Sequence, residues 1–172
     1  MLADIGLEAT TQQIVTSAQA VLQLVADEVP ATSKLLIIGA DSFRDLAREM
    51  GFEVVPSADD KPAAVVQGFD RSVGWEQLTE GALAIRQGAK FFASNLDTSL
   101  PIERGFAVGN GSLVAAIQSA TGVEPVSAGK PEPAMFTFAA KQIGAKKPLA
   151  VGDRLDTDIA GGNSAAMNTF HV

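Results

Sequence analysis

Apolar residues recur along the chain at two different spacings, and the two spacings alternate. Between residues 11 and 29 the apolar side chains follow one face of a helix: Ile14, Ala18, Val21, Leu22 and Val25. Thr10 or Thr11 precedes this pattern as an N-cap. Residues 35–40 form a short unbroken apolar run instead, which is typical of a strand buried on both faces.

This alternation continues to the end of the chain. Helices are predicted over residues 42–50, 75–87, 112–121, 133–143 and 158–166. Strands are predicted over residues 35–40, 52–55, 63–69, 90–94, 149–152 and 169–172, with another just before Gly129. Residues 95–111 contain Pro101 and several polar or glycine turns, so a long connection is expected there. Strands that alternate with helices predict an α/β fold with a mostly parallel sheet.

The C-terminal region reads as part of a domain. Val172 stops inside an apolar run, and the region from Val126 offers only about three strands, fewer than the five or six of an average sheet. We therefore expect an exposed apolar sheet edge there, unless other polypeptide covers it.

Composition narrows the class of protein. Hydrophobic residues make up 47% and charged residues 19% of the 172, the balance of a globular protein. No apolar run is long enough for a membrane helix. The net charge of −7 argues against nucleic-acid binding. The absence of cysteine and of a basic N-terminal signal region favours a cytoplasmic location.

The segment Val151–Ile159 has the residues of a metal site. An apolar strand delivers Asp153 at its carboxyl end, and Asp156 and Asp158 follow within six residues. Ligands bind at such strand ends in open α/β sheets, and Mg²⁺ prefers carboxylate and phosphate oxygens. From these residues alone, turn-forming and N-capping aspartates are an equally good interpretation.

A second segment, Ala128–Pro133, carries one lysine between a glycine and two prolines. Glycine permits close approach of the backbone to a ligand, and the prolines direct Lys130 from a strand end. The glycine spacing and Pro131 exclude a P-loop lysine. Lys130 therefore suits a phosphoryl group, although a solvated surface lysine is the commoner interpretation of one such residue.

Together the two segments resemble a known family. GKPEPAMF, followed about 20 residues later by VGDRLDTDIAGGNSAAMNT, resembles the third and fourth motifs of the haloacid dehalogenase superfamily. IVTSAQA, GFDRSVGWEQL and GAKFFASNLDTSLPIERGFAVGNGSLVAAIQSATG extend the resemblance to the p-nitrophenylphosphatase and phosphoglycolate-phosphatase-like branch, which has a large cap (subfamily IIA).

The resemblance implies a Mg²⁺-dependent phosphomonoesterase acting on a small phosphorylated metabolite. Lys130 matches the catalytic lysine that contacts the phosphate. Asp153 matches the metal-ligand aspartate, and Asp158 the second catalytic acidic residue, which supports the magnesium site. In this family an aspartate of a DxDG motif attacks phosphorus, and the aspartate two residues later acts as general acid and base.

The chain departs from the family at that motif. No DxDG follows an N-terminal strand; Asp4-Ile5-Gly6 lacks the first aspartate, and Asp156-Thr157-Asp158 is followed by isoleucine. Residues 1–7 resemble the helix after the second motif. We therefore expect a missing N-terminal core segment, and a chain that is inactive alone.

The resemblance also divides the chain. Residues 1–13 are expected as a core-derived segment, residues 14–122 as an α/β cap domain, and residues 123–172 as the C-terminal part of an incomplete Rossmann-like core. Asn95, Asp97 and the loop Phe69–Trp75 are the candidates for substrate contact. Asn95 and Asp97 as turn formers, and Trp75 as a partly buried helix residue, are the alternatives. His171 is expected to be structural. The cap suggests a homodimer, or a non-catalytic ligand-binding or assembly module.

Overall fold

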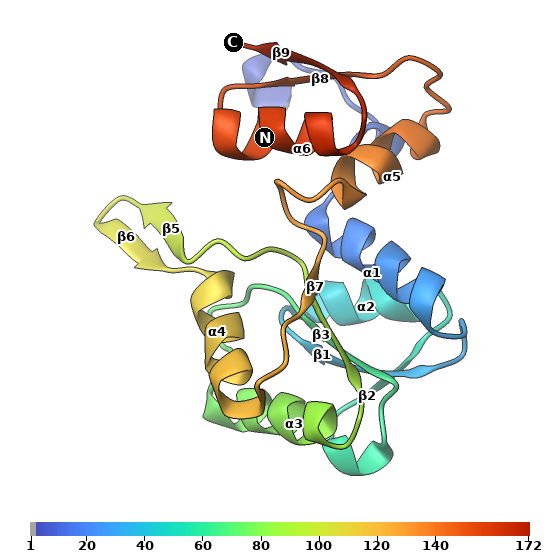
Figure 1. Ribbon diagram of the computed structural model, residues 1–172, viewed down its shortest axis with the longest axis vertical. Coiled ribbons are helices and arrows are strands. Elements are labelled where there is room, and N and C mark those ends of the chain that lie inside the picture. The colour runs from blue at the N-terminus through green and yellow to red at the C-terminus, as the bar shows by residue number, and fades with distance from the viewer. Residues whose placement is uncertain (1–2) are drawn as a thin grey trace.

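A computed structural model describes residues 3–172 and places the elements in two units (Figure 1). The helices, in chain order, are α1 Ser17–Glu28, α2 Asp41–Glu49, α3 Trp75–Arg86, α4 Asn110–Thr121, α5 Ala134–Gln142 and α6 Ala160–Ser164. The strands are β1 Lys34–Ile38, β2 Glu53–Val55, β3 Ala64–Gln67, β4 Lys90–Ala93, β5 Ser99–Ile102, β6 Gly105–Val108, β7 Val126–Ser127, β8 Leu149–Gly152 and β9 Asn168–His171.

The larger unit is built on a parallel five-stranded sheet in the order β2-β1-β3-β4-β7. Its central strands are buried on both faces, as their unbroken apolar sequences predict. One face packs under α1 and α2 around Leu22, Phe43 and Phe92. The opposite face packs under α3 and α4 around Ile38, Val65 and Ile117, among others. The predicted α/β class is confirmed as a three-layer arrangement.

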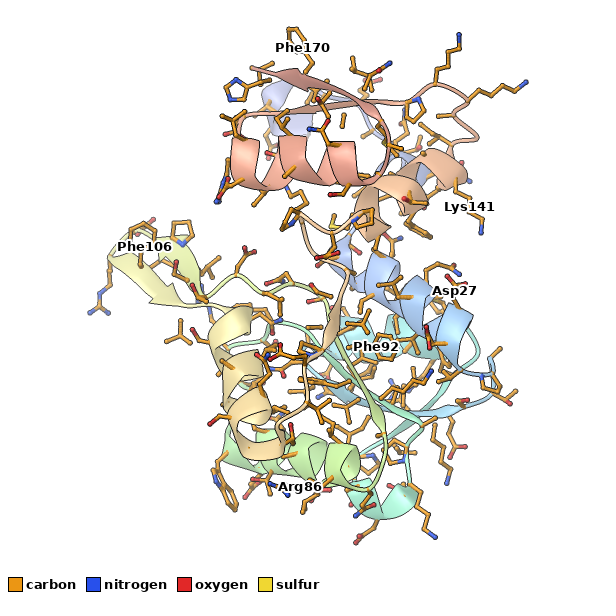
Figure 2. All side chains as sticks on the ribbon, viewed as in Figure 1. Asp27, Arg86, Phe92, Phe106, Lys141 and Phe170 are labelled. Atoms are coloured by element: carbon orange, nitrogen blue, oxygen red, sulfur yellow. The ribbon has the colours of Figure 1, made fainter. Side chains whose placement is uncertain are left out.

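The smaller unit contains two parallel strands, β8 and β9, with α6 on one side. Gly162 allows this packing, because a Cβ at that position would lie 2.7 Å from Ala150 Cβ. On the other side, three apolar side chains are more than half exposed: Leu149, Val151 and Phe170. Phe170 points outward from the strands in Figure 2. The prediction was an exposed apolar sheet edge, and the structure exposes these three side chains on a face of the β8–β9 pair.

Two segments connect the units. The first is the segment before α1, which contains the 3₁₀ turn Thr11–Gln13. This turn contacts α5, because Gln142 Nε2 donates a hydrogen bond to the Gln12 carbonyl oxygen at 2.6 Å. The second connection follows β7 and leads into α5, which packs against α1. Residues 1–2 of the expected core-derived segment lie outside the described residues.

Several sequence predictions differ from the structure in detail. The first helix begins at Ser17 because Thr16 caps it, accepting a hydrogen bond from the Gln19 backbone N–H, so the start at residue 11 is wrong. The long connection expected over residues 95–111 contains two strands that the sequence did not predict, because β5 and β6 form an antiparallel hairpin there. Pro101 lies on an edge strand of this hairpin, where a missing N–H is tolerated. β7 pairs with β4 and thus joins the first sheet.

Across the described residues, no helix is long and apolar enough to cross a membrane.

Candidate active site

The candidate site lies where the loops after β7 and β8 meet. Lys130 follows β7 by three residues, and Asp153 follows β8 directly. Both loops leave the carboxyl ends of parallel strands, the usual location of ligands in α/β folds. The two strands belong to different sheets, so the site is formed between the two units.

An ion pair joins the two loops. Lys130 Nζ lies 2.6 Å from Asp158 Oδ1, and the Asp158 side chain is only 14% exposed. The second carboxylate oxygen accepts a hydrogen bond from the Arg154 backbone N–H at 3.3 Å. The hydrogen bond from Lys130 lowers the pKa of Asp158 below its ordinary value. The site thus contains a fixed carboxylate and a lysine directed at it, 28 residues apart in the sequence.

Local backbone geometry brings Asp158 into this position. Asp158 lies in a π-helical turn, Leu155–Ile159, which precedes α6 and is closed by the Arg154 carbonyl oxygen. The turn returns over Gly152, the last residue of β8. A Cβ at Gly152 would lie 2.2 Å from Asp158 Cβ, so only glycine leaves room for the aspartate. The predicted helix over residues 158–166 is correspondingly shorter, Ala160–Ser164.

The three aspartates do not share one environment. Asp156 pairs on the surface with Arg154, at 2.8 Å between Nη2 and Oδ2, and this hydrogen bond lowers the pKa of Asp156. Asp158 pairs with Lys130 and also neighbours the side chain of Asp153, and Asp153 is itself exposed at the end of β8. Among the described residues, no three acidic or histidine side chains form a cluster that could hold a metal ion. A three-aspartate metal cluster is therefore not formed.

His171 contacts the same loop. Its Nε2 lies 3.2 Å from the Asp153 carbonyl oxygen, next to it across the β8–β9 pair. The sequence offered no partner for this histidine. In the structure it supports the backbone that carries Asp153, which agrees with a structural role.

Asn95 and Asp97 line a cavity of about 250 Å³ beside this site. Asn95 Oδ1 accepts a hydrogen bond from the Asp97 backbone N–H at 3.2 Å, so Asn95 shapes the turn as well as lining the cavity. The full lining is Phe69, Asn95, Asp97, Ser99, Leu100, Pro101, Gly109, Asn110 and Arg154. Of the loop Phe69–Trp75, Phe69 contributes, whereas Trp75 is 78% exposed and not partly buried as expected.

The lysine loop packs against one lining residue of the cavity through Gly129. A Cβ on Gly129 would lie 2.7 Å from Asn95 Cα, so the two backbones are in close contact. Arg154, the one lining residue from the smaller unit, was not identified from the sequence. The sequence could have indicated Arg154, because it directly follows Asp153 and therefore lies in the same loop at the end of the strand.

The chain is therefore an α/β protein in which the carboxyl ends of parallel strands present a lysine, three aspartates and a neighbouring cavity. Models of two related families match the chain: a haloacid dehalogenase-like hydrolase model over residues 1–53 and a HAD-hydrolase-like model over residues 127–172.

Individual relatives match almost the whole chain. A D-glycerol 3-phosphate phosphatase of Mycobacterium tuberculosis is 44% identical over 171 residues, 99% of this chain and 48% of the relative. The crystal structure of the glycerol phosphate phosphatase from that organism in complex with magnesium has a TM-score of 0.94 at 44% identity, covering 99% of this chain and 52% of the other. Another structure of that phosphatase contains calcium.

Two further relatives extend this likeness. An acid sugar phosphatase of Staphylococcus saprophyticus is 36% identical over 169 residues, 97% of this chain and 64% of the relative. The structure of a thermostable NPPase double mutant from Geobacillus stearothermophilus has a TM-score of 0.92 at 35% identity, covering 99% of this chain and 68% of the other. The chain spans about half the length of the first relative and about two thirds of these two. The chain belongs to the haloacid dehalogenase-like hydrolases.

Proposed function

We propose that this chain supplies the phosphoryl-binding lysine and the metal-binding carboxylate of a phosphomonoesterase that acts on a small phosphorylated metabolite. The observation that carries the proposal is the Lys130–Asp158 pair, at 2.6 Å, beside the exposed carboxylate of Asp153. Lys130 is held by a short contact with Asp158 and is 41% exposed, so a phosphoryl oxygen has access to its ammonium group. Asp158 positions Lys130 and the loop.

Magnesium is the metal that suits these residues. Mg²⁺ is usually bound through one or two carboxylates together with substrate phosphate and water, and Asp153 provides one such exposed carboxylate. When bound, the ion would offset negative charge on the transferring phosphoryl group. The magnesium and calcium complexes of the Mycobacterium tuberculosis relative support this assignment. With one exposed carboxylate, we expect weak affinity in the chain alone.

The nucleophile is proposed to come from polypeptide other than these 172 residues, in which no DxDG motif occurs. An aspartate of that motif would attack phosphorus, with Lys130 neutralising the charge that develops on the phosphoryl oxygens. The exposed surface of Leu149, Val151 and Phe170 supports this proposal, because additional strands or helices of a core would cover it. Residues 14–122 would then be the cap, which β7 joins by pairing with β4, and the residues after β7 would be the C-terminal part of the core.

A non-catalytic binding or assembly module is the second candidate, favoured by the absent motif. The hairpin of β5 and β6 projects from the larger unit, and Phe106 at its end is 82% exposed (Figure 2). Ile102 and Val108 of the same hairpin are also exposed, and an apolar surface of this kind suits a homodimer contact through the proposed cap.

Hydrolysis of p-nitrophenyl phosphate with Mg²⁺ separates the two candidates. The chain alone should show negligible turnover, and adding a separately produced core segment that contains a DxDG motif should produce hydrolysis. Lys130→Met should abolish that hydrolysis, whereas Lys141→Met, a change of an α5 lysine away from the site, should leave it. Robust turnover by the chain alone that depends on Lys130 and Asp153 would contradict the need for an external nucleophile. A complemented mixture without turnover would favour the binding module.

A further inference from the structure

The cavity beside Lys130 lies where the remainder of a phosphate ester would extend. Gly129 packs on Asn95, which lines the cavity, and Arg154 reaches it from the loop that also holds Asp158. A phosphoryl group bound at Lys130 is therefore flanked by the cavity on the side of Asn95 and Arg154. This position of the phosphate rests on the proposed function.

The size of the cavity limits the leaving group. Its volume of about 250 Å³ is below the roughly 300–1,000 Å³ of pockets that enclose drug-sized ligands. At about 30 Å³ for each water molecule, it holds on the order of eight waters. An alcohol with a few carbon atoms fits within this space, whereas a nucleoside would extend out of it into solvent.

The charges of the cavity limit the chemistry further. Asp97 brings a carboxylate, which only accepts hydrogen bonds, and Arg154 a guanidinium group, which only donates them. A second anionic group on the leaving group would be attracted by Arg154 but repelled by Asp97, and an ammonium group would be attracted by Asp97 but repelled by Arg154, so each charged group has one unfavourable neighbour. A hydroxyl group both donates and accepts, so it satisfies the two residues without a net charge.

The guanidinium group of Arg154 is held ready for such a contact. Its Nε and Nη2 donate to the two Asp156 carboxylate oxygens, at 3.2 and 2.8 Å. A guanidinium group has five N–H donors, so others stay available. A side chain fixed in this way loses less conformational freedom when a ligand binds.

We propose that Arg154 is a specificity-determining residue which, together with Asp97, binds the hydroxyl groups of a small neutral leaving group next to the phosphate at Lys130. The backbone and the side chain of Arg154 have separate tasks. The backbone N–H supports Asp158, and the side chain contacts the leaving group. Replacing the side chain alone therefore tests the second task without removing the first.

NMR titration of the ¹⁵N-labelled full chain provides the test. Glycerol should shift the Arg154 Nε–H and the Asn95 and Asp97 amide resonances, and 1-propanol should not. In the presence of Mg²⁺, glycerol 3-phosphate should bind at least about tenfold tighter than propyl phosphate, because its hydroxyl groups add hydrogen bonds to charged side chains. Adenosine 5′-monophosphate should bind no tighter than propyl phosphate.

Arg154→Met should bind glycerol 3-phosphate and propyl phosphate with about equal affinity. Arg48→Met is the matched control: it also removes an exposed local arginine–aspartate pair, with Asp45, and should keep the tenfold preference. A purely structural role of Arg154 would weaken both ligands equally and leave their ratio unchanged, which would overturn the proposal. Equal affinities of the wild-type chain for the two esters would overturn it as well.

Inorganic phosphate tests the proposed function separately, through the Gly129 and Lys130 amide resonances. If these fail to respond while glycerol still shifts the Arg154 resonance, the phosphate site is refuted and the polyol-binding cavity is supported. If phosphate shifts them and glycerol has no effect on Arg154, the cavity assignment is wrong and the phosphate site stands.

Discussion

Gly152 and Asp158 occupy adjoining space that admits only one side chain: a Cβ on Gly152 would lie 2.2 Å from Asp158 Cβ. We therefore expect Gly152→Ala to displace Asp158 and lengthen its contact with Lys130. Overpacking of this kind costs typically about 1–3 kcal/mol of unfolding free energy. Urea unfolding of the variant measures this loss.

A double-mutant cycle identifies the cause of that loss. In an Asp158→Gly background the colliding Cβ is absent, so adding Gly152→Ala should cost clearly less than it does in the wild-type chain. Equal costs in both backgrounds would mean that the crowding at residue 152 has another origin.

The ion pair predicts a dependence of stability on pH. The hydrogen bond from Lys130 places the folded-state pKa of Asp158 below its ordinary value. The resulting stabilisation is complete above the unfolded-state pKa of about 3.9 and is lost as the pH falls through the folded-state pKa. Asp158→Asn should remove this part of the acid-induced loss, measured by urea unfolding in EDTA below about pH 5.

Asp156→Asn serves as the comparison for this measurement. The Asp156 carboxylate also pairs with a cation, but the two side chains are 70% and 60% exposed. Solvent screens such a pair, so the variant should keep nearly the wild-type dependence on pH. A larger change for Asp156→Asn than for Asp158→Asn would contradict the assignment.

Magnesium binding should depend on Asp153 and little on Asp156. Asp153→Asn removes the exposed carboxylate at the end of β8 and should weaken Mg²⁺ binding about tenfold or more, measured by calorimetric titration. Asp156→Asn should leave the affinity close to that of the wild-type chain. The midpoint of thermal unfolding without metal should stay unchanged for Asp153→Asn, because the side chain is exposed. Tight stoichiometric binding that survives Asp153→Asn would place the metal elsewhere.

Phe92 lies in the buried core and Phe170 on the exposed apolar surface of β8 and β9, so alanine substitutions at the two positions should differ in effect. Phe92 is 1% exposed in the larger unit, so Phe92→Ala should lower the unfolding free energy by about 3–5 kcal/mol. Phe170 is 58% exposed, so Phe170→Ala should change the unfolding free energy by less than about 0.5 kcal/mol. The Phe170 variant should nevertheless bind less of the apolar dye ANS. Unchanged dye fluorescence would show that the β8–β9 surface is not an apolar binding surface.

The elements that sequence predicted best are those in which one local signal dominates. The strand Leu149–Gly152 was predicted at its exact bounds, because a short apolar run ends there at a glycine and an aspartate. The β5–β6 hairpin was missed because its side chains are mostly exposed and give no alternation of buried and exposed positions. The start of α1 was misplaced because two threonine caps, Thr10 and Thr16, precede apolar residues.

For the site, sequence indicated which residues matter but not how they are paired. The proximity of Lys130 to Asp158 depends on a chain reversal across Gly152, and a motif spacing carries no such distance. The proximity of Arg154 to Asp97 depends on how the two units meet. The partner of His171 is a backbone oxygen, which side-chain chemistry in the sequence does not reveal.

β7 has one further consequence. It pairs with β4 through only two residues, and Ala128 continues this pairing by donating to the Ala93 carbonyl oxygen. The backbone of Lys130 is thereby attached to the larger unit, whereas Asp158 belongs to the smaller one. Rotation of either unit relative to the other would lengthen or shorten the separation between the lysine and the aspartate. The strength of the attraction between Lys130 and Asp158 therefore depends on the angle between the two units.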